Sequence, residues 1–357
     1  MSNHGRRGGL AIAATLALAL LIPSTAMAGH DLLIYKQEAH VDLSADESTN
    51  SVSCNPGDYA LDGMWRIDHA DQDDYVAPLT LIAGAVDVVQ AELTSDNTYT
   101  FSFVKNAIGR AQVKIFVTCL GQKTSGDSHQ HSFTTSFVKS DNSPLGPNQW
   151  DAQSQNVTSV ANPAPTVTSA NATCPSGTRL VSPGFHAIAF SAGDPPAGIM
   201  RPVQSISSNG LDWSWKFENS ALPTTDNFTL WTSWRCLKVK VPVSGFDKHK
   251  LVFKFNHPVT FKPGANKVSE GQYNCGDHYK AIVAGFSIPA SGGDRSSYDQ
   301  NGDGIYDALQ ANTAFNHVYF LGMDPRPKQR AYRFVNRGPT TTWPISLKAL
   351  CLNYRTT

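Results

Sequence analysis

The chain has 357 residues, of which 29 are basic and 29 acidic, and charged residues make up only 16% of it. This balance argues against a nucleic-acid partner, which usually requires a basic face. The length exceeds what a single hydrophobic core normally supports, so we expect more than one domain.

The first 28 residues are typical of a secretory signal peptide. A basic start with Arg6 and Arg7 precedes the apolar run Leu10 to Ile22, and the small residues from Ala26 to Ala28 fit a cleavage site. The apolar run is shorter than the roughly 20 residues that span a bilayer, so we expect no transmembrane segment in the mature chain. The sequence therefore predicts a protein that is secreted, held at the cell surface or retained in the periplasm.

The rest of the chain repeats one pattern three times. Each copy opens with a cysteine, a turn, a short apolar strand and a glycine that precedes a large apolar residue. An alternating aromatic strand follows, and a last strand ends on a second cysteine. The aromatic strands are Tyr99 to Phe103, Trp213 to Phe217 and Tyr332 to Phe334. Three features in the same order, found three times, predict three related modules.

Period-two alternation and the lack of helical periodicity favour an all-β protein. We expect three tandem modules, each a β-sandwich or jelly-roll. Module 1 covers residues 29–140, module 2 covers 141–245 and begins with a Ser- and Pro-rich linker, and module 3 covers 246–357. The apolar stretch Leu32 to Tyr35 is predicted to pair with a sheet edge, in its own module by default and otherwise in a neighbour.

The six cysteines favour disulfides, because their number is even and the chain is exported. Metal ligation or free thiols are weak alternatives, since no C-x-x-C pair is present. The simplest pairing lies within each copy of the repeat. The predicted disulfides are Cys54–Cys119, Cys174–Cys236 and Cys275–Cys351.

The repeat resembles a module found in exported bacterial proteins of unassigned function. Its pattern is Cys-Pro-x-Gly, then Gly-aromatic, then W-x-W-x-F-x-N, and a closing strand that ends in Cys. Module 2 matches best, while modules 1 and 3 depart from the opening motif. The matching residues are Cys174, Pro175, Gly177, Gly184, Trp213, Asn219 and Cys236. The resemblance implies a fold and no activity.

Residues 299–307 of module 3 are similar to the calcium loops of thrombospondin type 3 and dockerin repeats. Oxygen side chains at positions 1, 3, 5 and 9, with glycine at position 6, suit Ca²⁺. Position 12, Gln310, cannot supply the bidentate carboxylate of a complete loop, so we expect weak affinity. An exposed Asn-Gly and Asp-Gly turn is the alternative. The predicted metal ligands are Asp299, Asn301, Asp303, Ile305 through its carbonyl, and Asp307.

Module 1 carries an acidic cluster, Asp68 to Tyr75, at the corresponding place in the repeat. Both loops follow the strand that comes after the opening cysteine, so we expect them at the same end of their modules. The cluster lacks the glycine of a calcium loop, so a solvated acidic turn is the favoured interpretation.

No catalytic constellation stands out, so we predict no enzyme activity. Export, disulfide-closed modules and the calcium-type loop favour a structural or adhesive protein of the cell surface or matrix, which could self-assemble into a filament. A carbohydrate-binding protein is the alternative, with surface polysaccharide as its partner, and a secreted hydrolase is less favoured. In the carbohydrate-binding alternative, exposed rings among Trp213, Trp215, Trp231 and Trp234 would stack on sugars; otherwise these rings are core.

Overall fold

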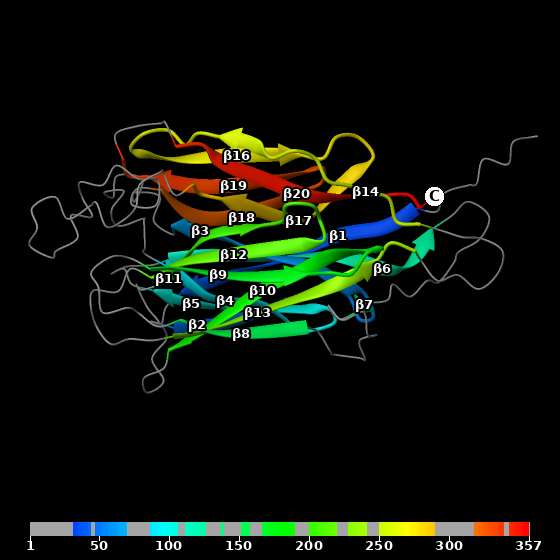
Figure 1. The fold of residues 1–357 in the computed structure, drawn as a ribbon, viewed down its shortest axis with the longest axis horizontal. Coiled ribbons are helices and arrows are strands. Elements are labelled where there is room, and N and C mark those ends of the chain that lie inside the picture. Colours follow the sequence, from blue (N-terminus) through cyan, green and yellow to red (C-terminus); the bar gives the residue numbers. More distant parts are fainter. Residues whose placement is uncertain are drawn as a thin grey trace, which may run out of the picture.

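The computed structural model describes residues 31–43, 47–69, 86–105, 111–125, 137–138, 151–157, 166–189, 200–219, 228–240, 250–289, 318–338 and 343–356. Every helix or strand assigned in these ranges is a β-strand, which confirms the all-β prediction. The strands form three antiparallel sheets and run mainly along the long axis of the molecule (Figure 1).

The first sheet has the order β1 (Asp31–Leu43), β6 (Ala111–Ser125), β3 (Tyr59–His69), β18 (Val318–Arg326), β19 (Gln329–Asn336) and β16 (Lys267–Asn274). The second has the order β2 (Glu47–Ser53), β5 (Thr98–Lys105), β4 (Val86–Ser95), β10 (Thr178–Ala189), β13 (Phe228–Lys238) and β7 (Phe137–Val138), and β8 (Asp151–Val157) also pairs with β13. The third has the order β14 (Phe253–Lys254), β20 (Ile345–Asn353), β17 (Tyr279–Ser287), β11 (Met200–Ile206), β12 (Asp212–Asn219) and β9 (Thr166–Thr173), and β15 (Val259–Phe261) pairs with β20.

Each sheet combines strands from two of the three modules. In the first sheet, β3 of module 1 pairs with β18 of module 3. In the second, β10 of module 2 pairs with β4 of module 1, and in the third, β17 of module 3 pairs with β11 of module 2. We call these three pairings the joints. Module 1 is thus joined to module 2, module 2 to module 3, and module 3 back to module 1.

The three disulfides form within the modules, as the repeat predicted. Cys54 pairs with Cys119, Cys174 with Cys236 and Cys275 with Cys351, across sequence separations of 65, 62 and 76 residues. Each second cysteine lies opposite the first part of a joint-forming strand, as Cys119 does opposite Ala60. Disulfides of this number are typical of proteins that fold in an oxidising compartment.

Removing one disulfide should destabilise the whole molecule. For the double variant Cys174→Ser/Cys236→Ser we expect the free energy of unfolding to fall by about 2–5 kcal/mol, because the unfolded chain regains the entropy of a long open loop. Denaturant titration of the purified variant beside the wild type measures this loss. An unchanged midpoint and slope would show that the bridge contributes nothing to stability.

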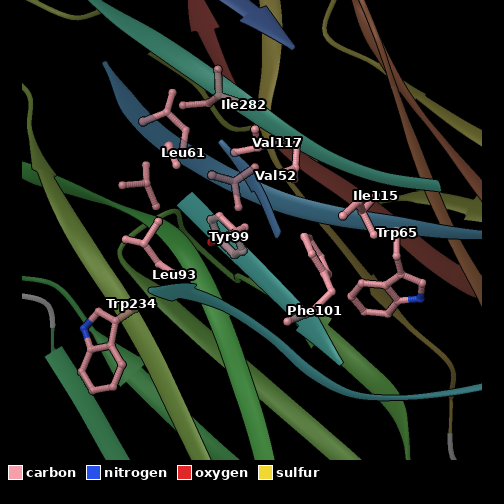
Figure 2. Packing of buried hydrophobic residues seen from close by; sticks show 14 of the residues in the cluster. Val52, Leu61, Trp65, Leu93, Tyr99, Phe101, Ile115, Val117, Trp234 and Ile282 are labelled. Carbon is pink, nitrogen blue, oxygen red and sulfur yellow. The ribbon is translucent and has the colours of Figure 1, made fainter. Parts of the chain in front are cut away.

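The largest hydrophobic cluster draws side chains from all three modules. It includes Leu61 of β3, Trp234 of β13 and Ile282 of β17, and Figure 2 shows all three in this one cluster. Tyr99 and Phe101 of β5 are fully buried in it. Because rings and aliphatic chains from different modules share one core, the modules stabilise one another and the packing is sandwich-like.

The start of β1 pairs within its own module, as expected by default. Ile34 lies opposite Leu120 and Tyr35 opposite Cys119, both on β6. The other edge of β1 meets the end of the chain, where the Leu32 N–H donates to the Tyr354 carbonyl at 2.6 Å and Asp31 lies opposite Arg355. The C-terminus lies beside the start of β1 in Figure 1.

Candidate functional site

A glycine allows the close approach of the backbones at each joint. A Cβ atom on Gly322 would lie 2.2 Å from the Trp65 carbonyl oxygen, and the φ of Gly322 is +123°. At the other joints, a Cβ on Gly285 would lie 2.5 Å from the Ser205 carbonyl oxygen, and one on Gly184 would lie 2.8 Å from a backbone atom. Gly184 and Gly285 are the repeat glycines of the sequence pattern, and this contact explains them physically.

A buried cation crosses each joint. Arg235 of β13 is 1% exposed and donates to the Asp96 carboxylate in the turn after β4. Lys348 of β20 donates to the Ser208 carbonyl at 2.8 Å, in the turn after β11. These two turns belong to the preceding module in each case, so each cation ties the last strand of one module to the module before it.

A buried cation also crosses the third joint, but here it belongs to module 3 and contacts the last strand of module 1. Arg330 of β19 is 2% exposed and donates its Nη2 to the Thr118 hydroxyl of β6 at 2.7 Å. The same nitrogen lies 3.8 Å from Oδ2 of Asp62, which is itself 2% exposed. The Ala284 N–H of β17 donates to this oxygen at 3.0 Å. Asp62 of β3 is therefore a buried carboxyl that contacts module 3 through two groups.

The surroundings of Asp62 favour its protonated form. Burial raises the pKa of the Asp62 carboxyl to about 8, against the lowering effects of Arg330 and of the Ala284 N–H. Burial also lowers the pKa of the Arg330 guanidinium. Tyr99 of β5, whose pKa burial raises, faces the same region from module 1. Asp62 is thus a poorly solvated carboxyl at the joint between modules 1 and 3.

The outer face of this joint carries a half-buried chain of ion pairs. Arg66 of β3 donates Nη2 to Asp68 and Nη1 to Asp324 of β18, each at 2.8 Å. Arg333 of β19 donates Nη1 to the other oxygen of Asp68 at 2.6 Å. Two guanidinium groups therefore neutralise Asp68, which the sequence placed in an acidic cluster.

The other two joints carry chains of contacting polar side chains with fewer charged groups at the corresponding place. In the second sheet, the His186 Nδ1 lies 3.2 Å from a Glu92 oxygen that also accepts a 2.6 Å hydrogen bond from Gln90. In the third sheet, Ser287 donates to the Gln204 carbonyl oxygen at 3.0 Å and the Gln204 amide nitrogen donates to Ser214 at 3.1 Å. These side chains satisfy one another across the joints, which is a stabilising arrangement.

The described strands that flank the two acidic loops of modules 1 and 3 end at one end of their sheets, as do the strands at the corresponding place in module 2. Arg66 lies opposite Gly322 in an antiparallel pair, so the end of β3 and the start of β18 share one end of the first sheet. The pairs Phe185–Ala91 and Ser287–Gln204 relate the ends of β10 and β17 to the starts of β4 and β11 in the same way. The described strands that flank the two acidic loops therefore end on the same side of the molecule, away from the disulfides.

The calcium-type loop itself, from Asp299 through Asn301, Asp303 and Ile305 to Asp307, lies outside the described residues, as do residues 70–75 of the acidic cluster. The metal site stays a prediction. Within the described ranges, no three His, Cys, Asp or Glu side chains gather in a way that could hold a metal ion.

The described tryptophans of module 2 belong to the core. Trp213, Trp215 and Trp234 are 3%, 1% and 6% exposed. The Trp213 Nε1 donates to the Ser205 hydroxyl at 3.0 Å, which satisfies its polar atom inside the sheet. These three rings cannot form an exposed platform for sugars; the side chain of Trp231 lies outside the described part.

Sequence reasoning missed the buried charges at the joints. Asp62 interrupts an apolar strand, directly before the repeat glycine Gly63, and Arg235 stands between Trp234 and Cys236. A charged residue inside an otherwise apolar strand is a signal for a buried, paired group, because an isolated buried charge is costly. The partners themselves come from other modules, which no local pattern reveals.

No protein-family model matches this chain, and no curated protein sequence matches it either. In the part of the chain that the structure describes, no helix could cross a membrane.

Proposed function

We propose that the protein is an exported structural or adhesive protein of the cell surface or extracellular matrix and that it acts without catalysis. The observation that supports this proposal best is the way the modules share their sheets. Three disulfides, three glycine-dependent joints and a largest core cluster with side chains from all three modules connect the parts of the chain, an arrangement that we expect to resist local opening. Such an arrangement suits a protein whose task is to keep its shape outside the cell.

The arrangement of the connections supports an adhesive role. The strands that flank the variable segments end on one side, and these segments differ between modules: acidic in module 1, Pro-containing in module 2 and calcium-like in module 3. Binding residues are commonly carried on loops that a rigid scaffold positions. We therefore assign contact with a partner to this end of the molecule, with calcium stabilising the module 3 segment.

Assembly is tested on the mature protein by light scattering with and without Ca²⁺. The proposal predicts species larger than a monomer, and a shift towards larger mass with calcium if the module 3 loop takes part. A monomer under both conditions would exclude the filament form of the proposal. A monomer that co-sediments with surface polysaccharide would instead favour the carbohydrate-binding alternative.

Calorimetry tests the calcium loop by comparing wild type with Asp303→Ala. The substitution removes a carboxylate at position 5 of the loop, so we expect the calcium binding heat to disappear while the fold is kept. The control is Asp194→Ala, which alters the corresponding segment of module 2, where no ligand set exists. Identical calcium heats for Asp303→Ala and wild type would exclude the site.

A further inference from the structure

β1 is an edge strand with a free side in the described part of the chain. It ends the first sheet and pairs with β6 on one side only. Residues 354–355 cover its other side only at the start, next to Asp31 and Leu32. In the described ranges, no strand pairs with the outer side of β1 from Tyr35 to Leu43. An open edge of this length presents unpaired backbone groups that can accept another strand.

The exposed side chains on this free stretch alternate in charge. Lys36, Glu38, His40 and Asp42 all lie on one face of the strand, since their positions differ by two. The side chains of Lys36, Glu38 and His40 are 49%, 42% and 62% exposed, and Asp42 is exposed as well. Along the strand, the side-chain charge is positive at Lys36 and negative at Glu38. It is positive at His40 when the imidazole is protonated, and negative at Asp42. Within one chain, Lys36 Nζ reaches Glu38 at 2.8 Å.

A strand whose charges alternate in this way is complementary to a second copy of itself that runs in the opposite direction. We propose that β1 pairs antiparallel with β1 of a second copy of this chain, with the twofold axis at Ala39. In that register Lys36 faces Asp42 of the second copy, and Glu38 faces His40. The register also uses the whole free stretch, because Ala39 lies midway between Tyr35 and Leu43. Opposite charges that face each other across antiparallel strands stabilise the pair.

The neighbouring registers are disfavoured by like charges. A shift that centres the pair on Glu38 sets this carboxylate against itself and Lys36 against His40, and a shift to His40 sets Glu38 against Asp42. Charged residues on an edge strand usually prevent pairing with an arbitrary strand. Alternation restricts pairing to a partner with the matching order of charges, and β1 itself is such a partner.

This inference rests on the proposed structural role and specifies the strand through which two copies of the chain contact each other. A twofold contact of this kind closes a dimer, so any filament would need a second, different interface. The dimer can therefore be tested separately from larger assembly.

The test measures dimerisation of mature protein by analytical ultracentrifugation across a concentration series. Lys36→Glu and Asp42→Lys each place like charges opposite each other, so each should weaken dimerisation about tenfold or more. The control Lys267→Glu makes the same charge change at the start of β16, at the opposite edge of the first sheet, and should leave the dimer unchanged. The wild-type dimer should weaken at high salt.

Mixing the two single variants gives the sharpest outcome. In a mixed dimer, Glu at position 36 of one chain faces Lys at position 42 of the other, and Asp42 faces Lys36, so heterodimers should form where each variant alone stays monomeric. The double variant should also regain the dimer. A monomeric wild type, or a dimer that ignores both substitutions, overturns the β1 contact. In the second case the proposed function still stands, because assembly then uses another surface.

Discussion

Gly322→Ala is expected to lower the free energy of unfolding by about 3 kcal/mol or more, because two separate costs add at this position. A Cβ would lie 2.2 Å from the Trp65 carbonyl oxygen and 2.7 Å from Arg66 Cα, and both are backbone atoms of β3 that cannot move alone. The φ of +123° is also unfavourable for alanine. β18 would have to separate from β3, which opens the joint between modules 1 and 3.

Gly177→Ala is the matched control for this prediction. Gly177 has a φ of +81°, but a Cβ there would meet nothing within 4 Å. The control therefore carries the backbone strain without the close approach, and we expect a loss of about 1 kcal/mol. Denaturant titration compares the two variants with wild type. Equal losses would mean that the β3–β18 contact does not contribute to stability.

The second large effect concerns the Asp62 carboxyl, which should make the free energy of unfolding fall as the pH rises. In the unfolded chain this carboxyl titrates near pH 4, and in the folded chain burial raises its pKa to about 8. Between these values the folded chain keeps a proton that the unfolded chain releases. Stability from this group is complete below about pH 4 and is lost as the pH rises through 8, by up to about 1.4 kcal/mol per pH unit.

Asp62→Asn isolates this effect, since asparagine keeps the volume and can still accept the Ala284 N–H. The free energy of unfolding of wild type minus that of the variant should fall steadily from pH 4 to pH 8. Asp277→Asn serves as the control: this exposed carboxyl has its pKa lowered by Lys328, so its difference should stay level between pH 4 and pH 8 and should fall only as the pH drops below 4. If the Asp62 difference instead stays level over this range, Arg330 dominates over burial and the carboxyl is ionised throughout.

The buried faces of the strands and the disulfide pairing could be predicted from the sequence, because both follow from local or repeated residue patterns. Alternation in Trp213, Trp215 and Phe217 indicated one buried face, and all three side chains are buried. The order of cysteines within the repeat predicted all three disulfides. These features depend on neighbours in the sequence, or on a repeat that can be compared with itself.

The sharing of sheets between modules could not be predicted in the same way. The joints rest on very few residue pairs, such as Arg66 with Gly322 and His186 with Gln90. An apolar strand such as β3 satisfies its pattern equally well with any neighbour, so its partner is decided by the close approach that a glycine on the other strand permits. The buried cations were hidden for a related reason: Arg330 and Thr118 are 212 residues apart.

Hydrogen exchange measured by mass spectrometry under native conditions tests the central claim, that three modules form one cooperative body, most directly. The joint strands β3, β4, β10, β11, β17 and β18 belong to different modules. If the joints hold as described, their amides should exchange through a common opening, with a free energy equal to that of global unfolding. Strands of one module that open together at a lower free energy, while the other two modules stay protected, would contradict the account.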